Sequence, residues 1–284
     1  MASTELKWAT EQRFQFIEYQ AFWLGSLNRV DLTSHFGISV PQASKDIAAY
    51  QSLFPKNIQY DHSDKRYFVT KEFAPQFIEL NPDVFLNGLL KESEGSQNPT
   101  LLPTEGVPIP KRLIDSYVLQ SVTECMANNQ SVEVLYQSMS PSKPDAIWRR
   151  ITPHSFATDG LRWHTRAYCH IDQKFKDFLL SRCLGSREHG APGAAFHDDI
   201  YWNKFFDIHL APNPALSASQ KKVVATDYGM RDTRLTVSTR MAMLYYFEKR
   251  LRLDVAHLMD DPGECPVIIE NKSAFDAAVE EATK

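Results

Sequence analysis

Residues 161–170, LRWHTRAYCH, place side chains suited to binding an anion at every second position of one predicted strand. Successive side chains of a strand point to opposite faces, and one face here has basic and aromatic residues and no carboxylate. Guanidinium groups form paired hydrogen bonds with phosphate oxygens, and aromatic rings stack on bases. We therefore expect a nucleotide or an oligonucleotide to bind this face, which carries Arg162, His164, Arg166, Tyr168 and His170.

The other face of this segment predicts a layer of the core, formed by Leu161, Trp163, Thr165, Ala167 and Cys169. We expect Trp163 to pack in that core rather than against a ligand. Neighbouring segments contribute further basic side chains that could converge on the ligand face, namely Arg149, Arg150, His154 and Arg182. The alternative is a set of surface arginines, each paired with an Asp or Glu elsewhere in the chain.

The net charge of the 284-residue chain is -4, from 31 basic and 35 acidic residues, which by itself argues against nucleic-acid binding. The average hides a basic middle, because residues 131–190 carry nine basic and six acidic side chains. Residues 1–90 carry eight basic and ten acidic side chains. If these first residues bind DNA, we expect modest affinity from one copy, dependence on a dimer and strong sensitivity to salt.

Strand-like runs at residues 132–139, 147–156, 161–170 and 175–184 follow a predicted helix at 114–127. Several short strands in a small span favour a strongly bent sheet or barrel. Residues 92–110 contain four prolines and two glycines and predict a linker, and prolines at 212 and 214 mark a softer boundary. After this boundary the pattern predicts a strand at 234–240, a helix at 241–253 and a strand at 266–272.

The first ninety residues have the local signals of a winged helix. One helix is indicated by Leu6, Phe14, Ile17, Ala21 and Leu24, and another by Ala43, Ile47, Tyr50 and Leu53. Between them, Asn28 is expected to cap a short helix that Gly37 ends, and Ser39 and Gln42 are expected to form a capping box. Short alternating segments at 58–60 and 67–69 predict a two-stranded wing. The alternative is a small helical domain with no DNA-binding role.

In a helix-turn-helix, the outward side chains near the start of the second helix contact bases, and a wing contacts the backbone or the minor groove. Gln can pair with adenine, and Lys can neutralise a phosphate or contact guanine. The predicted DNA-binding residues are Ser39, Gln42, Ser44 and Lys45 on the helix and His62, Ser63, Lys65 and Arg66 on the wing.

The sequence also predicts several absences. No apolar run approaches the roughly 20 residues of a membrane-spanning helix, and the first residues lack the pattern of a signal peptide, so we expect a cytoplasmic location without membrane contact. The four cysteines, Cys125, Cys169, Cys183 and Cys265, form no C-x-x-C pair and are expected to be reduced thiols. We expect no metal site, no cofactor and no catalytic residue.

The segments IEYQAFWLGSLNRVDLTSHFGISVPQASKDIAAYQ, YDHSDKRYFVT, RRITPH, RWHTRAYC and FLLSRCLG together resemble the WYL-domain transcriptional regulators of phage-defence operons, of the CapW/BrxR type. The resemblance covers nearly the whole chain, although Trp163-His164-Thr165 stands where the wider family has Trp-Tyr-Leu. It implies an α+β multidomain protein: an N-terminal winged helix-turn-helix, a central WYL domain built as an Sm/SH3-like β-barrel, and a C-terminal mixed α/β dimerisation domain. It places ligand sensing at Tyr136, Ser138, Arg149, Arg150, His154, His164, Arg166, Tyr168 and Arg182.

On this basis we expect a DNA-binding domain at 1–91, a linker and connecting helix at 92–130, a WYL ligand-sensing domain at 131–214 and a dimerisation extension at 215–284. The expected function is a homodimeric repressor that binds a palindromic double-stranded operator and is released by a nucleotide or nucleic-acid effector. One alternative is a transcriptional activator. Another is a nucleic-acid-processing enzyme using His154, His164 or Cys169, although Cys169 and His164 fall on opposite faces of a regular strand.

Overall fold

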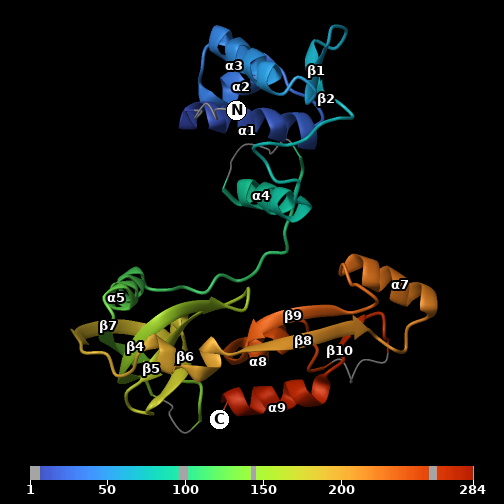
Figure 1. Ribbon diagram of the computed structural model, residues 1–284. Helices are drawn as coiled ribbons and strands as arrows, with labels where there is room; N and C mark the ends of the chain where they lie inside the picture. The colour runs from blue at the N-terminus through green and yellow to red at the C-terminus, as the bar shows by residue number, and fades with distance from the viewer. Residues whose placement is uncertain (1–6, 96–101, 142–144, 256–260, 284) are drawn as a thin grey trace. The chain divides into compact units, whose positions relative to one another are not determined.

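The computed structural model describes residues 7–95, 102–141, 145–255 and 261–283, and the chain divides into two compact units, Met1–Pro108 and Ile109–Lys284 (Figure 1). Leu6 and the part of the predicted linker at residues 96–101 lie outside the described residues. Within the described segments, no helix has the length and apolar character needed to cross a membrane.

The first unit is a three-helix domain followed by a two-stranded wing and a further helix. Its elements are α1 (Trp8–Trp23), α2 (Arg29–Phe36), α3 (Val40–Leu53), β1 (Ile58–Asp61), β2 (Arg66–Val69) and α4 (Pro82–Gly95). Strands β1 and β2 are antiparallel, with Ile58 opposite Val69 and Asp61 opposite Arg66. The predicted helix, turn, helix and wing are therefore confirmed in their order and nearly in their bounds.

Local capping explains why these helices begin and end where they do. The side chain of Asn28 accepts hydrogen bonds from the amides of Val30 and Asp31, and the Asp31 carboxylate accepts one from the Asn28 amide. Gly37 ends α2 with a φ of 64°, a conformation that glycine adopts without steric cost. Ser39 caps α3 by accepting from the amide of Gln42 at 3.4 Å.

The predicted capping box at α3 is only half correct, because the Gln42 side chain does not return to Ser39. Its amide donates to Asp46 one turn further on. The predicted apolar side of α3 also ends earlier than expected: Ala43, Ile47 and Tyr50 are fully buried, but Leu53 is 53% exposed. Leu53 is the last residue of its helix, where the apolar spacing continues but no partner element covers it.

A buried carboxylate fastens the chain after the wing to the helical core. Glu18, on α1, is fully buried, and its oxygens accept from the Tyr50 hydroxyl at 2.8 Å and from the amides of Gln76, Phe77 and Ile78 at 2.8 to 3.2 Å. Burying an ionised carboxylate is costly unless hydrogen bonds replace its water shell. Four donors do so here, and they fix the path of residues 76–78 across α1.

The second unit begins with one helix packed on a five-stranded sheet. The elements are α5 (Ser116–Ala127), β3 (Ser131–Tyr136), β4 (Ile147–Thr158), β5 (Trp163–Cys169), β6 (Lys174–Leu179) and β7 (Cys183–Gly190). The strands are antiparallel in the order β6-β5-β4-β3-β7. The run at 175–184 was predicted as one strand, but a short 3-10 helix at Leu180–Arg182 divides it between β6 and β7.

This sheet is bent at a bulge in its central strand. In β4, Pro153 lies opposite Ala167 and Ser155 lies opposite Arg166, so His154 is the extra residue. A proline cannot donate to the ladder, and a bulge bends a strand and redirects a side chain. Among the described residues, β6 and β7 are edge strands that do not pair with each other. Closure of the sheet into a barrel is therefore not shown, and it stays a prediction.

The rest of the second unit is a three-stranded sheet with helices around it. Its elements are α6 (Ile200–Asn203), β8 (Phe205–Pro212), α7 (Ala218–Asp227), β9 (Leu235–Arg240), α8 (Leu244–Arg250), β10 (Val267–Ile269) and α9 (Lys272–Thr283). The strand order is β10-β8-β9, so β8 lies in the middle although it precedes the boundary expected at residue 214. Met241 and Leu244 belong to the core of this region, whereas Tyr245 and Leu251 are 43% and 37% exposed.

We expect Glu18→Gln to lower the free energy of unfolding by about 2 to 3 kcal/mol, because an amide nitrogen replaces one acceptor and faces backbone N–H groups. Urea denaturation of the full-length chain, followed by circular dichroism, measures this loss. Glu11→Gln on the exposed side of the same helix is the control, and it should change stability by less than about 0.5 kcal/mol. Equal stability of the two variants would contradict this account of Glu18.

Candidate functional site

The predicted DNA-reading side chains of α3 differ in their exposure and in the hydrogen bonds that they make within the protein. Lys45 is exposed, and Gln42 and Ser44 are half-buried. The Ser44 hydroxyl donates to the carbonyl of Val40 and lies 3.5 Å from an Arg29 nitrogen. Ser39 acts as the helix cap, so its side chain serves the helix start. The surface therefore presents Gln42 and Lys45, with Arg29 from α2 beside them.

The wing places its polar residues in two different settings. His62, Ser63 and Lys65 are exposed in the turn between β1 and β2, and Lys65 has a φ of 54°. Arg66 was expected beside them, but its guanidinium donates to Ser26 at 2.6 Å and to Asp31 at 3.1 Å. Arg66 thus fastens the wing to the start of α2. A DNA contact by any of these residues stays a prediction.

The apolar face of β5 is confirmed for three residues and wrong for two. Thr165, Ala167 and Cys169 are fully buried, whereas Leu161 and Trp163 are 49% and 53% exposed. Helix α5 packs with Ala167 and Cys169, at the far end of the strand from Trp163. Alternation predicted the direction of the Trp163 side chain but not whether anything would cover it.

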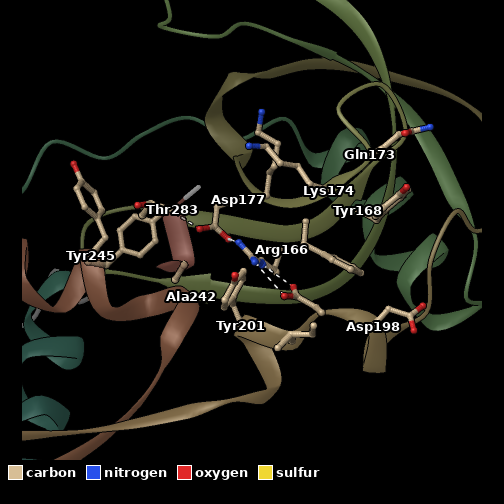
Figure 2. Close-up of a pocket in the computed structure, with 16 residues that line it drawn as sticks. Arg166, Tyr168, Gln173, Lys174, Asp177, Asp198, Tyr201, Ala242, Tyr245 and Thr283 are labelled. Carbon is tan, nitrogen blue, oxygen red and sulfur yellow. Dashed lines mark hydrogen bonds and ion pairs between the residues drawn. The ribbon is translucent and has the colours of Figure 1, made fainter. Parts of the chain in front are cut away.

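The face of β5 expected to meet a ligand is partly covered by the protein itself. His164 and Arg166 are each only 4% exposed. The Arg166 guanidinium donates to both oxygens of Asp199, at 2.7 and 3.1 Å, and to Asp177 at 3.3 Å. Figure 2 shows Arg166 at the centre of this group, with Asp177 on one side. The strand itself carries no carboxylate on this face, but the fold brings two to it.

Asp199 joins three elements at this point. It caps α6 by accepting from the Trp202 amide, it is fully buried, and His154 lies 3.1 Å from its Oδ2 atom. Burial alone raises the pKa of Asp199, but the hydrogen bonds from His154 and Arg166 outweigh it and lower that pKa to about 2. Burial also opposes the charge of Arg166, and the two carboxylates still raise its pKa. The bulge at His154 therefore directs that ring to a partner that is ionised at neutral pH.

A second contact connects this cluster to helix α8 of the C-terminal region. The Tyr246 hydroxyl on α8 donates to Asp177 at 3.0 Å, and its ring lies 4.9 Å from that of His164. Burial, followed by the charge of Asp177, raises the pKa of Tyr246, so the hydroxyl keeps its proton. Burial lowers the pKa of His164 and favours its neutral form. At Asp177, the neutral Tyr246 hydroxyl thus donates to a carboxylate that is already paired with Arg166.

A cavity of about 490 Å³ opens beside the Arg166 cluster, between β5 and β6 on one side and α8 and α9 on the other (Figure 2). Its wall combines aromatic rings with basic side chains. The aromatic residues are Tyr168, Phe175, Tyr201, Tyr245 and Tyr246, the basic residues are Arg166, Lys174 and Lys176, and the acidic residues are Asp177, Asp198 and Asp199. Such a wall can stack a planar group, and an anion can bind its cations by competing with the carboxylates for them.

The predicted ligand residues do not all meet at this cavity. Arg166 and Tyr168 line it, and His154 and His164 contact its Arg166 cluster. The others lie outside its lining: Tyr136, Ser138, Arg149, Arg150 and Arg182.

Carboxylates already pair with two of the outlying arginines. Arg149 is buried against Asp172 at 2.9 Å, and Arg150 lies 3.3 and 3.4 Å from Glu133 and Glu188. Lys176 also bonds to Asp172 and is the main reason that the pKa of this carboxyl is far below its usual range. The expectation of one converging cationic surface is therefore wrong for these arginines, because their charges are matched within the protein.

Sequence reasoning missed the acidic and aromatic partners of the site. These are Asp177, Asp199, Tyr201, Tyr245 and Tyr246. An Asp directly before Ile-Tyr-Trp is a helix-cap signal that the sequence does contain, but only the fold shows that it faces Arg166. Within the described segments, no group of three or more His, Cys, Asp or Glu side chains is arranged to hold a metal ion.

We expect Asp199→Asn to lower the free energy of unfolding by about 3 kcal/mol or more, because it leaves the buried guanidinium of Arg166 partly unpaired. Chemical denaturation measures the loss. Asp198→Asn is the matched control, since this neighbouring carboxylate is 53% exposed and loses only one hydrogen-bonded cap, worth about 1 kcal/mol.

Wild type and Asp199→Asn can also be compared in acid. The pKa of Asp199 is about 2 in the folded protein and about 4 in an unfolded chain. Its contribution to stability is therefore complete above about pH 4 and disappears as the pH falls towards 2. The stability difference between wild type and Asp199→Asn should shrink over this window. A difference that stays constant from pH 5 to pH 2 would contradict the assignment.

Comparison with known proteins agrees with this architecture. The family model of the BrxR transcriptional regulator winged helix-turn-helix domain matches residues 9–91, the WYL domain model matches 117–186, and the BrxR C-terminal dimerization domain model matches 205–275. Among solved structures, the proteasome accessory factor B/C of Arthrobacter aurescens overlaps with a TM-score of 0.26 and 14% identity over 97% of this chain. The chain spans 49% of that protein, and an overlap this low supports no statement about fold or function.

Three curated relatives carry the description DNA-binding transcriptional repressor CapW. The protein of Escherichia coli (strain KTE188) is 36% identical, with 97% of this chain and 93% of the relative covered. Those of Stenotrophomonas maltophilia and Pseudomonas aeruginosa are 34% and 32% identical, covering 95% and 94% of this chain and 92% and 90% of the relatives. The matched BrxR domains are those of a transcriptional regulator, which favours a regulatory protein over a nucleic-acid-processing enzyme. The chain belongs to the family of WYL-domain transcriptional regulators of the BrxR and CapW type.

Proposed function

We propose that the protein is a repressor that binds a palindromic operator as a homodimer, controls a phage-defence operon, and is released by a nucleotide or nucleic-acid effector. The observation that carries the proposal is the winged helix itself, with Gln42 and Lys45 on the outward side of α3. The relatives named as DNA-binding repressors and the match to a dimerisation domain support it. The proposal keeps the predicted order of the four parts and a barrel-like WYL domain, and it assigns β8 to the C-terminal region.

Dimerisation compensates for the small number of cations in the DNA-binding unit. With eight basic and ten acidic side chains in residues 1–90, one copy has few cations to exchange for counterions on DNA. Two copies double the phosphate contacts and read two half-sites related by the two-fold axis. Repression is then relieved when the distance between the two winged helices no longer matches the distance between the two half-sites.

The effector is proposed to act at the cavity beside Arg166. An anionic group entering there competes with Asp177 for the guanidinium, and Asp177 is also the acceptor for Tyr246 on α8. Binding therefore changes the contact between the WYL sheet and the C-terminal region. Such coupling needs an effector that binds the operator-free conformation more tightly than the operator-bound one.

Operator binding is tested by gel shift with the DNA directly upstream of the gene. We expect the full-length protein to shift this DNA at low salt, with affinity that falls steeply as salt rises. Lys45→Ala should weaken binding and reduce the salt dependence, since it removes one cation from the DNA-facing side. Lys111→Ala, at an exposed site outside the winged helix, is the control. Failure to bind at low salt would overturn the proposal of an autoregulated operator.

The effector site is tested with Tyr245→Ala. Tyr245 is 43% exposed and lines the cavity, so its loss should spare operator binding but weaken release by the effector by about tenfold, the worth of one stacked base. Short single-stranded DNA, RNA and cyclic nucleotides are the competitors in the same gel shift. Tyr117→Ala on α5 is the matched control, because that ring is 80% exposed and is not part of the cavity lining. Equal release of both variants would exclude this cavity as the effector site.

A further inference from the structure

We propose that Gln42 selects an amino base, adenine or cytosine, at one position of each operator half-site, and that Asp46 and Arg13 impose this selectivity by fixing the orientation of its amide. The inference rests on the proposed function in one respect, since it takes α3 as the helix that enters the major groove. The positioning residues Arg13 and Asp46 are not themselves expected to contact DNA.

The three side chains form a chain of contacts from α1 to the start of α3. The Arg13 Nε atom lies 2.6 Å from Asp46 Oδ2, and a second guanidinium nitrogen lies 3.4 Å from Oδ1. The Gln42 amide nitrogen lies 2.9 Å from Oδ1 and 3.1 Å from Oδ2 of the same carboxylate. The side chains of Arg13 and Asp46 are only 14% and 6% exposed. The carboxylate is therefore held in place before DNA arrives.

This contact decides which atom of the Gln42 amide faces outward. An ionised carboxylate has only acceptors, and the Arg13 guanidinium that bonds to Asp46 has only donors. The amide must therefore turn its NH2 group to Asp46, since an oxygen there would face two other acceptors. The Oε1 atom is left on the far side, and among the described residues it accepts no hydrogen bond. Gln42 thus presents an acceptor at the outward edge of α3.

An outward acceptor distinguishes bases by their exocyclic groups. In the major groove adenine and cytosine offer amino donors, N6 and N4, whereas guanine and thymine offer carbonyl oxygens at the corresponding positions. Oε1 accepts from the first pair and is repelled by the second. A glutamine that is free to rotate its amide lacks this distinction, because it can present either its NH2 group or its oxygen. The Asp46 contact therefore converts an adaptable side chain into a selective one.

The neighbouring side chains do not duplicate this role. The Ser44 hydroxyl donates to the Val40 carbonyl and accepts from Arg29 at 3.5 Å, and Ser39 accepts from the Gln42 backbone amide. Lys45 is exposed and has donors only. At the start of α3, Gln42 is thus the side chain with an acceptor that is both held in position and outward.

The experiment is selection of binding sites from a randomised DNA library with the full-length protein, followed by sequencing. We expect wild type to require adenine or cytosine at one position of each half-site, by about tenfold or more over guanine and thymine. Gln42→Lys replaces the acceptor by donors, so the preference at that position should change to guanine or thymine. Gln42→Ala should remove the preference there and leave the other positions unchanged.

Asp46→Asn tests the positioning role. Asparagine keeps the size of the side chain but can accept or donate, so Gln42 regains both orientations, and the preference at this one position should weaken at least several-fold. A purely structural role would lower affinity for all sequences equally and leave the preference intact. Gln51→Lys, later on the same helix, adds the same charge as Gln42→Lys and should not change any base preference. Circular dichroism of each variant shows that it is folded.

The outcomes separate the two proposals. If wild type enriches no sequence at low salt, operator recognition by this protein is overturned, and the inference about Gln42 with it. If wild type enriches a clear half-site but Gln42→Lys and Gln42→Ala select the same bases as wild type, only the inference is wrong. If both Gln42 variants change one position while Asp46→Asn does not, Gln42 reads a base without the fixed orientation, and the selectivity attributed to Asp46 and Arg13 is overturned.

Discussion

The second unit depends on neutralising one buried guanidinium. Arg166 is buried on β5, an inner strand of the sheet, where an unpaired charge would cost several kcal/mol. The fold supplies Asp177 from the adjacent strand and Asp199 from the segment that leads into β8. Because both carboxylates must be in place, the path of the chain from the WYL sheet to the C-terminal sheet is fixed at this point. The bulge at His154 and the cap of α6 meet the same requirement from two further elements.

The winged helix solves a similar problem with the signs reversed. There the buried charges are carboxylates, Glu18 and Asp46, and their partners are backbone amides in one case and a guanidinium in the other. In both units an ionic group sits where three segments meet, and its hydrogen bonds set the distances between them. Apolar contacts supply most of the driving force for folding, but they are less directional. The ionic groups therefore position the side chains that face DNA or a ligand.

The features that could be predicted from the sequence are those set by interactions between residues close together in the chain. Asn28, Gly37 and Ser39 act within four residues of themselves, so the helix-turn-helix and its wing were predicted almost residue by residue. The strands of the WYL sheet were also evident from alternation, except where a 3-10 turn divides the last one.

The site was less predictable because its partners are distant in sequence. Asp177 and Asp199 lie 11 and 33 positions from Arg166, and Tyr246 lies 69 positions from Asp177. Alternation alone placed His164 and Arg166 on a face open to a ligand, and it could not show that α6 and α8 cover them. It also placed Trp163 in the core, although this side chain is 53% exposed in the described part of the chain. The direction of a side chain is a local property, whereas its environment is not.

The position of β8 has a consequence for exchanging parts between relatives. Asp199 belongs to the Arg166 cluster, yet only five residues separate it from Phe205, the first residue of the strand at the centre of the C-terminal sheet. A hybrid protein joined between β7 and α6 would take the arginine from one parent and its carboxylate from the other. A junction after β8 would separate the middle strand from both of its neighbours. The sensing and C-terminal regions should therefore be transferred together from one parent. A foreign DNA-binding domain is best joined in the segment before α5.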